Sequence, residues 1–259
     1  MSEKKDVVPA PKHELADWQK QLADMAITTA EQEKPSGSWV SFKAGVLSFA
    51  GNPIKGNKMK VVVVHSAHEN QLYATKDEKG ELVGLRYDAD NPATPVCYAI
   101  AENEEDLKPH PDSLWPQSES CTGCPRNEWK SDFEGGNGKA CKNVRRLAMI
   151  AFDDMGSIPK AQVAMAKLPV TSVKNWSTYA NQIANVLKLP PLAVITEMSV
   201  EPNAKTVFQI NFDLVDKISD GAQIQALLSK RKDTTPLIFA GYDKPTEPKQ
   251  ATPAAATKY

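Results

Sequence analysis

The chain has 259 residues, of which 41% are hydrophobic and 24% charged, a composition typical of a globular protein with a sizeable core. Its formal net charge of −1 excludes nucleic-acid binding through overall charge, so such binding would need a local basic surface. No apolar run approaches the roughly 20 residues of a membrane helix, and residues 1–12 lack the apolar core of a signal peptide. We therefore expect a cytoplasmic protein without a membrane partner.

Residues 1–34 are predicted to form a polar tail followed by an amphipathic helix. Leu15, Trp18, Leu22 and Met25 recur at helical spacing and would share one face of that helix. The helix either packs on its own domain or binds a partner protein, and the pattern fits both interpretations.

Residues 35–156 are predicted to be rich in β-strands. Strand-like patterns extend over 38–51, 58–68 and 71–76, and Val61–Val64 has the pattern of a short, fully buried strand. A further strand or short helix is expected directly after the last cysteine of the chain. We expect this region to be β-rich, with an OB-like barrel as its candidate form.

Residues 157–243 are predicted to form a smaller α/β part that packs on the β-rich region. The expected elements are, in chain order, a helix at 172–187, strands at 192–200 and 206–215, and a helix at 221–232. Ser172 is expected to cap the first helix, and the Glu-Pro-Asn triplet at 201–203 to join the strands. Residues 244–259 are rich in Pro, Ala and Thr and are predicted to be a disordered tail. The expected fold class is α+β.

The segment 87–142 has little apolar periodicity and is dense in Pro, Gly, Asn and acidic residues. A loop of this length is uncommon in a compact domain unless something else organises it. The segment contains all the cysteines of the chain, Cys97, Cys121, Cys124 and Cys141. Two cysteines separated by two residues can direct both thiolates at one ion, and four thiolates form the closed set typical of structural zinc. Metal binding would supply folding free energy to a segment that lacks a core of its own.

Other interpretations of the cysteines stay open at this point. They could be buried thiols without a metal, or Cys121 and Cys124 could form a redox pair, although no βαβ pattern surrounds them. Cys124-Pro125 resembles the motifs of iron–sulfur proteins, so a cluster is a further alternative to zinc. His110 could replace Cys97 as the fourth ligand, but we prefer Cys97 because it completes a set of four thiolates.

Motifs of common enzyme active sites are missing from the sequence. It contains no GxxxxGK[ST] phosphate loop, no GxGxxG after a strand, no HExxH and no nucleophile elbow. We therefore expect no catalytic residues and no enzymatic activity.

Basic and aromatic residues alternate around the cysteines and at the start of the β-rich region. Lys and Arg neutralise phosphates while aromatic rings stack on bases, which is the combination expected for single-stranded nucleic acid. The residues expected to contact it are Trp39, Lys43, Arg126, Trp129, Lys130, Lys139, Lys142, Arg145 and Arg146. The alternative is a solvated loop whose aromatic rings cover a metal site.

Four segments within residues 38–152 carry a family resemblance: SFKAGVLSFAGNPIKGNKMKVVVV, HENQLY, PATPVCYAI and CTGCPRNEWKSDFEGGNGKACKNVRRLA. They resemble a group of small phage-encoded four-cysteine proteins assigned to DNA metabolism, including single-stranded DNA binding. The resemblance implies a phage origin, the cytoplasm of an infected bacterium, and a metal site at the four cysteines. It also implies sequence-tolerant binding of single-stranded DNA in replication or recombination. The alternative is a zinc-stabilised interaction module that acts on a polymerase, nuclease or recombinase.

Overall fold

The structure is a computed structural model that describes Trp18, residues 20–22, Met25, and residues 39–85 and 93–242. The chain divides into two compact units, Met1–Gly37 and Ser38–Tyr259. The described residues of the first unit are helical, as predicted, and Trp18, Leu22 and Met25 are exposed. The predicted tail at 244–259 lies outside the described residues.

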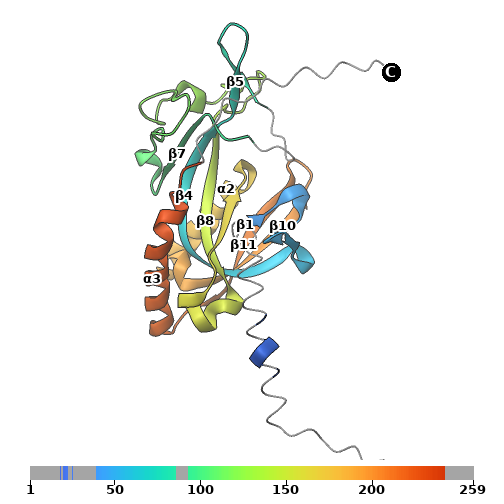
Figure 1. The fold of residues 1–259 in the computed structure, drawn as a ribbon, viewed down its shortest axis with the longest axis vertical. Coiled ribbons are helices and arrows are strands. Elements are labelled where there is room, and N and C mark those ends of the chain that lie inside the picture. Colours follow the sequence, from blue (N-terminus) through green and yellow to red (C-terminus); the bar gives the residue numbers. More distant parts are fainter. Residues whose placement is uncertain (1–17, 19, 23–24, 26–38, 86–92, 243–259) are drawn as a thin grey trace, which may run out of the picture. The chain divides into compact units, whose positions relative to one another are not determined.

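The second unit is built on a strongly curled mixed sheet (Figure 1), and its fold is α+β as predicted. In the described part of the chain the strand order is β11 (Val207–Lys217), β10 (Val194–Asn203), β4 (Lys58–Leu72), β8 (Lys142–Ala151), β9 (Ala164–Leu168), β1 (Trp39–Ser41), β2 (Ser48–Phe49) and β3 (Asn52–Pro53). The strand β7 (Cys97–Ala101) also pairs with β4. The pair β1–β9 is parallel, and the other pairs of this sheet are antiparallel.

The strand β4 connects the two ends of the sheet. Along one edge its first residues pair with β10 and its last residues with β7, while β8 pairs along the other edge. A bulge between Val63 and His65 interrupts the pairing with β8, and bulges bend a strand and increase its twist. The short strand expected at Val61–Val64 is thus part of the first half of a fifteen-residue strand. This strand carries the sheet from the hydrophobic core to the cysteine-containing loop.

The sheet crosses the boundary that was predicted at residue 156/157. The strands β9, β10 and β11 all follow this position in the chain, yet they lie in the same sheet as β4 and β8. The predicted β-rich region and C-terminal region therefore share one sheet instead of packing as separate parts.

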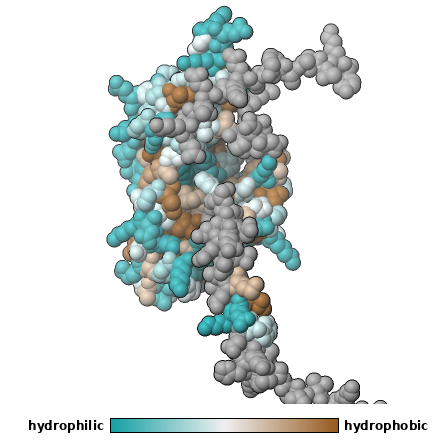
Figure 2. All heavy atoms as spheres, viewed as in Figure 1, coloured by the Kyte–Doolittle hydropathy of each residue, from teal (hydrophilic) through white to brown (hydrophobic). Residues whose placement is uncertain are grey.

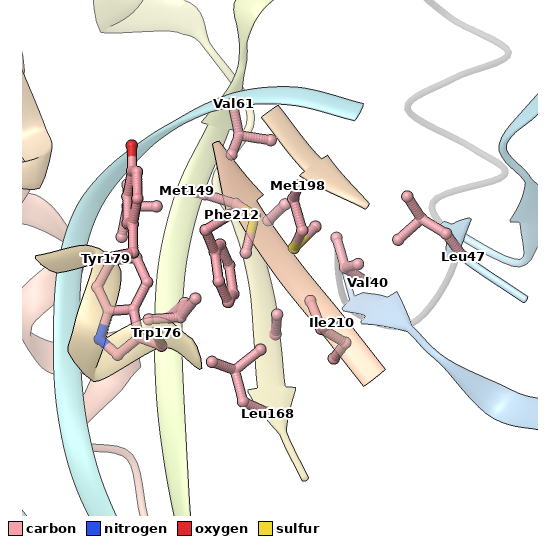
Figure 3. Packing of buried hydrophobic residues seen from close by; sticks show 14 of the residues in the cluster. Val40, Leu47, Val61, Met149, Leu168, Trp176, Tyr179, Met198, Ile210 and Phe212 are labelled. Carbon is pink, nitrogen blue, oxygen red and sulfur yellow. The ribbon is translucent and has the colours of Figure 1, made fainter. Parts of the chain in front are cut away.

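Helices cover both faces of the sheet. The helix α2 (Val170–Gln182), continued by a π-helical turn at Ile183–Leu187, places Trp176 and Tyr179 against Phe212 of β11 (Figure 3). On the other face, α3 (Gly221–Ile238) and the 3-10 segment Phe152–Lys160 pack against the alternate residues of β4. Apolar residues gather towards the middle of the unit in Figure 2, whereas its upper tip is hydrophilic.

Shorter elements complete the chain. A separate hairpin joins β5 (Ala74–Lys76) to β6 (Leu82–Gly84). Further 3-10 turns lie at Lys43–Gly45, Lys55–Asn57, Glu104–Asp106, Pro125–Asn127 and Pro191–Ala193. The turn predicted at 201–203 instead lies at 204–206, and Asn203 stabilises it by accepting hydrogen bonds from Lys205 and Thr206 on its side-chain oxygen.

Ser172 does not cap α2, contrary to the prediction. Pro169 holds the N-cap position, and the buried Ser172 hydroxyl accepts a hydrogen bond from the Ile210 backbone N–H at 3.0 Å. Ser172→Ala is expected to lower the free energy of unfolding by about 1 to 3 kcal/mol, because it leaves a buried N–H without a partner. Urea unfolding would measure this, with the exposed Thr178→Ala in the same helix as control. Equal effects of the two variants would contradict the assigned role.

Candidate functional site

The four cysteines line one small cavity at the end of the sheet, with a volume of about 10 Å³. Cys97 opens β7 and Cys141 immediately precedes β8, so the two strands that flank the end of β4 deliver both thiols. Cys121 and Cys124 come from the long connection between these strands. All four thiols are buried and none forms a disulfide. A cavity of this size holds about one water molecule, which is also the scale of a single ion.

Backbone hydrogen bonds fix the turn that carries Cys121 and Cys124. The Cys124 N–H donates to the Cys121 carbonyl at 3.5 Å, and the Cys141 N–H donates to the Arg126 carbonyl at 2.8 Å. Gly123 has φ of +74°, a left-handed conformation that favours glycine. The Cys-Thr-Gly-Cys sequence therefore suits a tight turn with both thiols on its inner side, and Cys141 is attached to the same turn.

Hydrogen-bond donors surround the thiols. The pKa is raised for Cys97, for Cys121 to about 11 and for Cys141 to about 12; burial is the largest cause, and the charges of neighbouring cysteines act in the same direction. Donors oppose this effect: the Gln71 backbone N–H lowers the pKa of Cys141, and the Asn70 side chain lowers that of Cys121. Cys97, Cys121 and Cys141 disfavour their own ionisation yet have donors for thiolates, which is the environment that a cation would stabilise.

The thiols are not arranged as a finished ligand set. Within the part of the chain that the structure describes, no group of three or more His, Cys, Asp or Glu side chains is placed to hold a metal ion. The cysteines thus share a cavity and influence one another electrostatically, but joint ligation would require them to move closer together. The soft donor set suits zinc or an iron–sulfur cluster.

His110, the alternative fourth ligand, lies outside the residues that line the cavity. Its Nδ1 is 2.9 Å from the Tyr98 hydroxyl, and its ring stacks on Tyr98 with the centroids 4.7 Å apart. The structure therefore groups Cys97 with the other cysteines and engages His110 with Tyr98.

The loop outside the cavity carries several of the predicted nucleic-acid contacts. Trp129 is 73% exposed, and the Lys139 ammonium lies 5.5 Å from the centre of its ring. Lys130 is exposed, and Arg126 lies 4.8 Å from the centre of the Phe133 ring. An exposed indole with a cation held over it can stack on a base while the cation approaches a phosphate.

Other predicted contacts lie apart from this arrangement or are already paired. Lys142 pairs with Asp132 at 3.3 Å. Trp39 and Lys43 are both exposed, but Trp39 lies in β1 and Lys43 in the turn that follows it. In the sheet, β9 separates β1 from β8. The sheet order thus places two of the predicted contacts on a second surface.

Arg145 and Arg146 take different environments. They are adjacent in β8, and successive strand residues point to opposite faces. Arg146 is only 4% exposed and donates two hydrogen bonds of 2.8 Å to Glu69, so the structure gives it a role in the interior in place of the predicted phosphate contact. Arg145 is partly exposed and lies on the other face.

No protein-family model, curated protein or solved structure matches this chain. The described residues also contain no helix of sufficient length and apolarity to cross a membrane.

A buried polar cluster on the α3 face was missed by the sequence reasoning. Glu69, with no exposed surface, accepts hydrogen bonds from Arg146 and from the Tyr242 hydroxyl, and the Lys167 ammonium lies 3.6 Å away. Arg146 also donates to the carbonyls of Ile238 and Ala240, so this cluster fastens the end of α3 to the sheet. The sequence did contain a signal for this cluster, because Glu69 and Arg146 are charged residues within the apolar strands β4 and β8.

Proposed function

We propose that this chain binds single-stranded DNA without sequence preference, in phage DNA replication or recombination, and that its four cysteines hold a structural zinc ion. The observation that carries the proposal is the exposed Trp129 with Lys139 beside its ring, on a loop attached to the cysteine cavity. An exposed aromatic ring is free to stack on a base, and the neighbouring cation favours a partner that is also anionic.

Each part of the loop would have a distinct task in binding. Trp129 would stack on a base, and Lys130 and Lys139 would neutralise phosphates on either side. Arg126, held against Phe133, would fix the local shape of the loop and offer its guanidinium to the backbone. Lys142 would exchange Asp132 for a phosphate.

Cys97, Cys121, Cys124 and Cys141 would be the zinc ligands in this proposal. Zinc bound by four thiolates has no open coordination position, so it would supply charge neutralisation and loop stability and no catalysis. An iron–sulfur cluster is the alternative for the same donors, and brown colour with visible absorbance in the purified protein would identify it.

The curled sheet supports the proposal in a limited way. OB-folds bind single strands on a curved, strand-rich surface, and a curled sheet could serve similarly. The parallel pair β1–β9 and the helices on both faces differ from a simple five-stranded barrel. We therefore propose a similarity to OB-folds only in the curvature of the sheet. The functional proposal rests on the residues of the site.

A fluorescence-anisotropy titration with a mixed-sequence single strand tests the proposal. We expect binding that weakens strongly with added salt and exceeds binding to the matching duplex. Trp129→Ala is expected to weaken it by about 5- to 150-fold, because stacking contributes about 1 to 3 kcal/mol per base. Phe152→Ala, at an exposed aromatic residue on another segment, is the control and leaves the affinity unchanged. Trp39→Ala reports whether the second predicted surface takes part.

Absence of binding at low salt would refute the proposal. The alternative would then lead: a zinc-stabilised module that binds a polymerase, nuclease or recombinase. The exposed Trp18, Leu22 and Met25 on the N-terminal helix favour this alternative as a docking face.

A further inference from the structure

The guanidinium of Arg145 contains a buried hydrogen-bond donor without a partner. Its Nε is buried and has no hydrogen-bond acceptor, and no other buried side-chain nitrogen or oxygen shares this state among the residues that the structure describes. The residue as a whole is partly exposed, so other atoms of Arg145 reach the surface. A buried unpaired donor on a charged group is costly, and in native proteins it usually has a water, an ion or a ligand as partner.

The sheet places a second donor beside Arg145. In the register of the strands, Arg145 is directly opposite His68 of β4 on one side and Leu168 of β9 on the other, and His68 is opposite Ala101 of β7. Residues directly opposite in antiparallel strands share a face and have neighbouring side chains. Arg145 and His68 thus form a polar pair with apolar neighbours on both sides, where an electrostatic interaction is stronger than in water.

The charges around this pair lack a bonded anion. Burial lowers the pKa of Arg145, and burial together with the charge of Arg145 lowers the pKa of His68. Glu104 raises the pKa of both by its charge, and Glu105 raises that of His68, but both glutamates are exposed and neither accepts a hydrogen bond from the Arg145 Nε. An anion between the two side chains would supply the missing opposite charge.

We infer that Arg145 and His68 form an oxyanion site that takes one phosphate group. The planar fork of an arginine matches two oxygens of a phosphate, which an ammonium group cannot reproduce. The phosphate would be a phosphodiester of the bound strand, an identification that rests on the proposed function, or otherwise free inorganic phosphate. The next residue pair on the same face of β4 and β8 is Asn70 opposite Asn143. The side chain of Asn143 donates a hydrogen bond of 2.9 Å to Asn127 in the loop that carries the cysteines.

The Nε–H signal of Arg145 provides a direct test. In nitrogen-15 spectra of the full chain, titration with inorganic phosphate is expected to shift this signal with saturation, and its absence from Arg145→Met gives the assignment. Arg145→Lys is expected to weaken phosphate binding by about tenfold or more, because it keeps the charge but loses the paired donors. Glu104→Gln, at an exposed position, is expected to strengthen binding by about two- to fivefold because it removes a nearby negative charge. Lys205→Met, at an exposed position in the turn between β10 and β11, is the control for an exposed cation and leaves phosphate affinity unchanged.

The outcomes separate this site from the proposed function. Parallel losses of phosphate and single-stranded DNA affinity in Arg145→Lys support both. Phosphate binding at Arg145 without any DNA binding supports the oxyanion site as one for free phosphate and refutes the proposed function. DNA binding that Trp129→Ala weakens but Arg145→Lys does not alter overturns the site's role with the strand. An unshifted Nε–H signal, or a Glu104→Gln variant as unstable as Arg145→Met, overturns the site itself, because Glu104 would then be the structural partner.

Discussion

Glutamine in place of Glu69 is expected to lower the free energy of unfolding by about 3 to 5 kcal/mol, the usual cost of removing one partner from a buried ion pair. Glu69 has no exposed surface, and the substitution leaves the buried Arg146 guanidinium without its anion. Glutamine keeps one acceptor oxygen and replaces the other with an NH2 donor, so Lys167 and the Tyr242 hydroxyl would share the remaining oxygen with Arg146. Chemical denaturation with two spectroscopic probes measures the loss.

Two further variants identify the cause of that loss. Glu197→Gln breaks the pair with the exposed Lys58 and is expected to change stability little, because exposed pairs contribute weakly. The double variant Glu69→Gln/Arg146→Met is expected to recover part of the lost free energy of unfolding. It removes the Arg146 charge, which would otherwise stay buried without the Glu69 carboxylate. A double variant less stable than the sum of the two single variants would contradict the ion-pair explanation.

The same cluster gives the stability a defined dependence on pH. Burial tends to raise the pKa of Glu69, but hydrogen bonds from Arg146 and the charge of Lys167 outweigh it and hold the pKa below 4.5, the ordinary value. A carboxyl group whose pKa is lower when folded stabilises the native state fully above its unfolded pKa and loses this contribution as pH falls through the folded pKa. The acid limb of the stability profile is therefore expected to flatten in Glu69→Gln.

Local sequence patterns predicted the elements that carry their own periodicity. Alternation located β10 and β11, and helical spacing located α2, because each of these elements has one apolar face. The helix α3 was predicted at 221–232 and continues to Ile238. The strand β9 was missed because its short, Ala-rich sequence, AMAKL, has little alternation and is defined by pairing with β8 and β1. Such pairings join residues far apart in the chain, and local sequence does not encode them.

The candidate site shows the same division. The number and spacing of the cysteines predicted that these four residues would lie together, and all four line one cavity. This was predictable because cysteine is a rare residue type and all four lie in one segment of the sequence. The donors to these thiols were not predictable, because Asn70 and the Gln71 backbone belong to β4 and reach the cavity only through the sheet. The basic run before Leu147 was interpreted as one surface, but strand geometry turns Arg145 and Arg146 to opposite faces.

Serine in place of Cys141 is expected to abolish zinc binding and with it the zinc-dependent part of the stability. A ligand that binds only the native state at about 1,000 times its Kd stabilises that state by about 4 kcal/mol. Cys141 is the most suitable position, because its N–H is bonded to the turn of the other cysteines and its thiol lies in their cavity. Metal analysis after dialysis would give zinc content, and denaturation with and without zinc would give the stability difference.

The comparison without zinc decides between a metal ligand and a simple core residue. If Cys141 binds zinc, the wild type and Cys141→Ser differ by about 4 kcal/mol at that zinc concentration and by little in the presence of a chelator. If the thiol only fills space in a buried cavity, the variant is destabilised equally under both conditions, and the metal proposal fails. Hydrogen exchange adds a local measure, because zinc loss is expected to release protection first in the segment between β7 and β8, whose short elements lack a large core of their own.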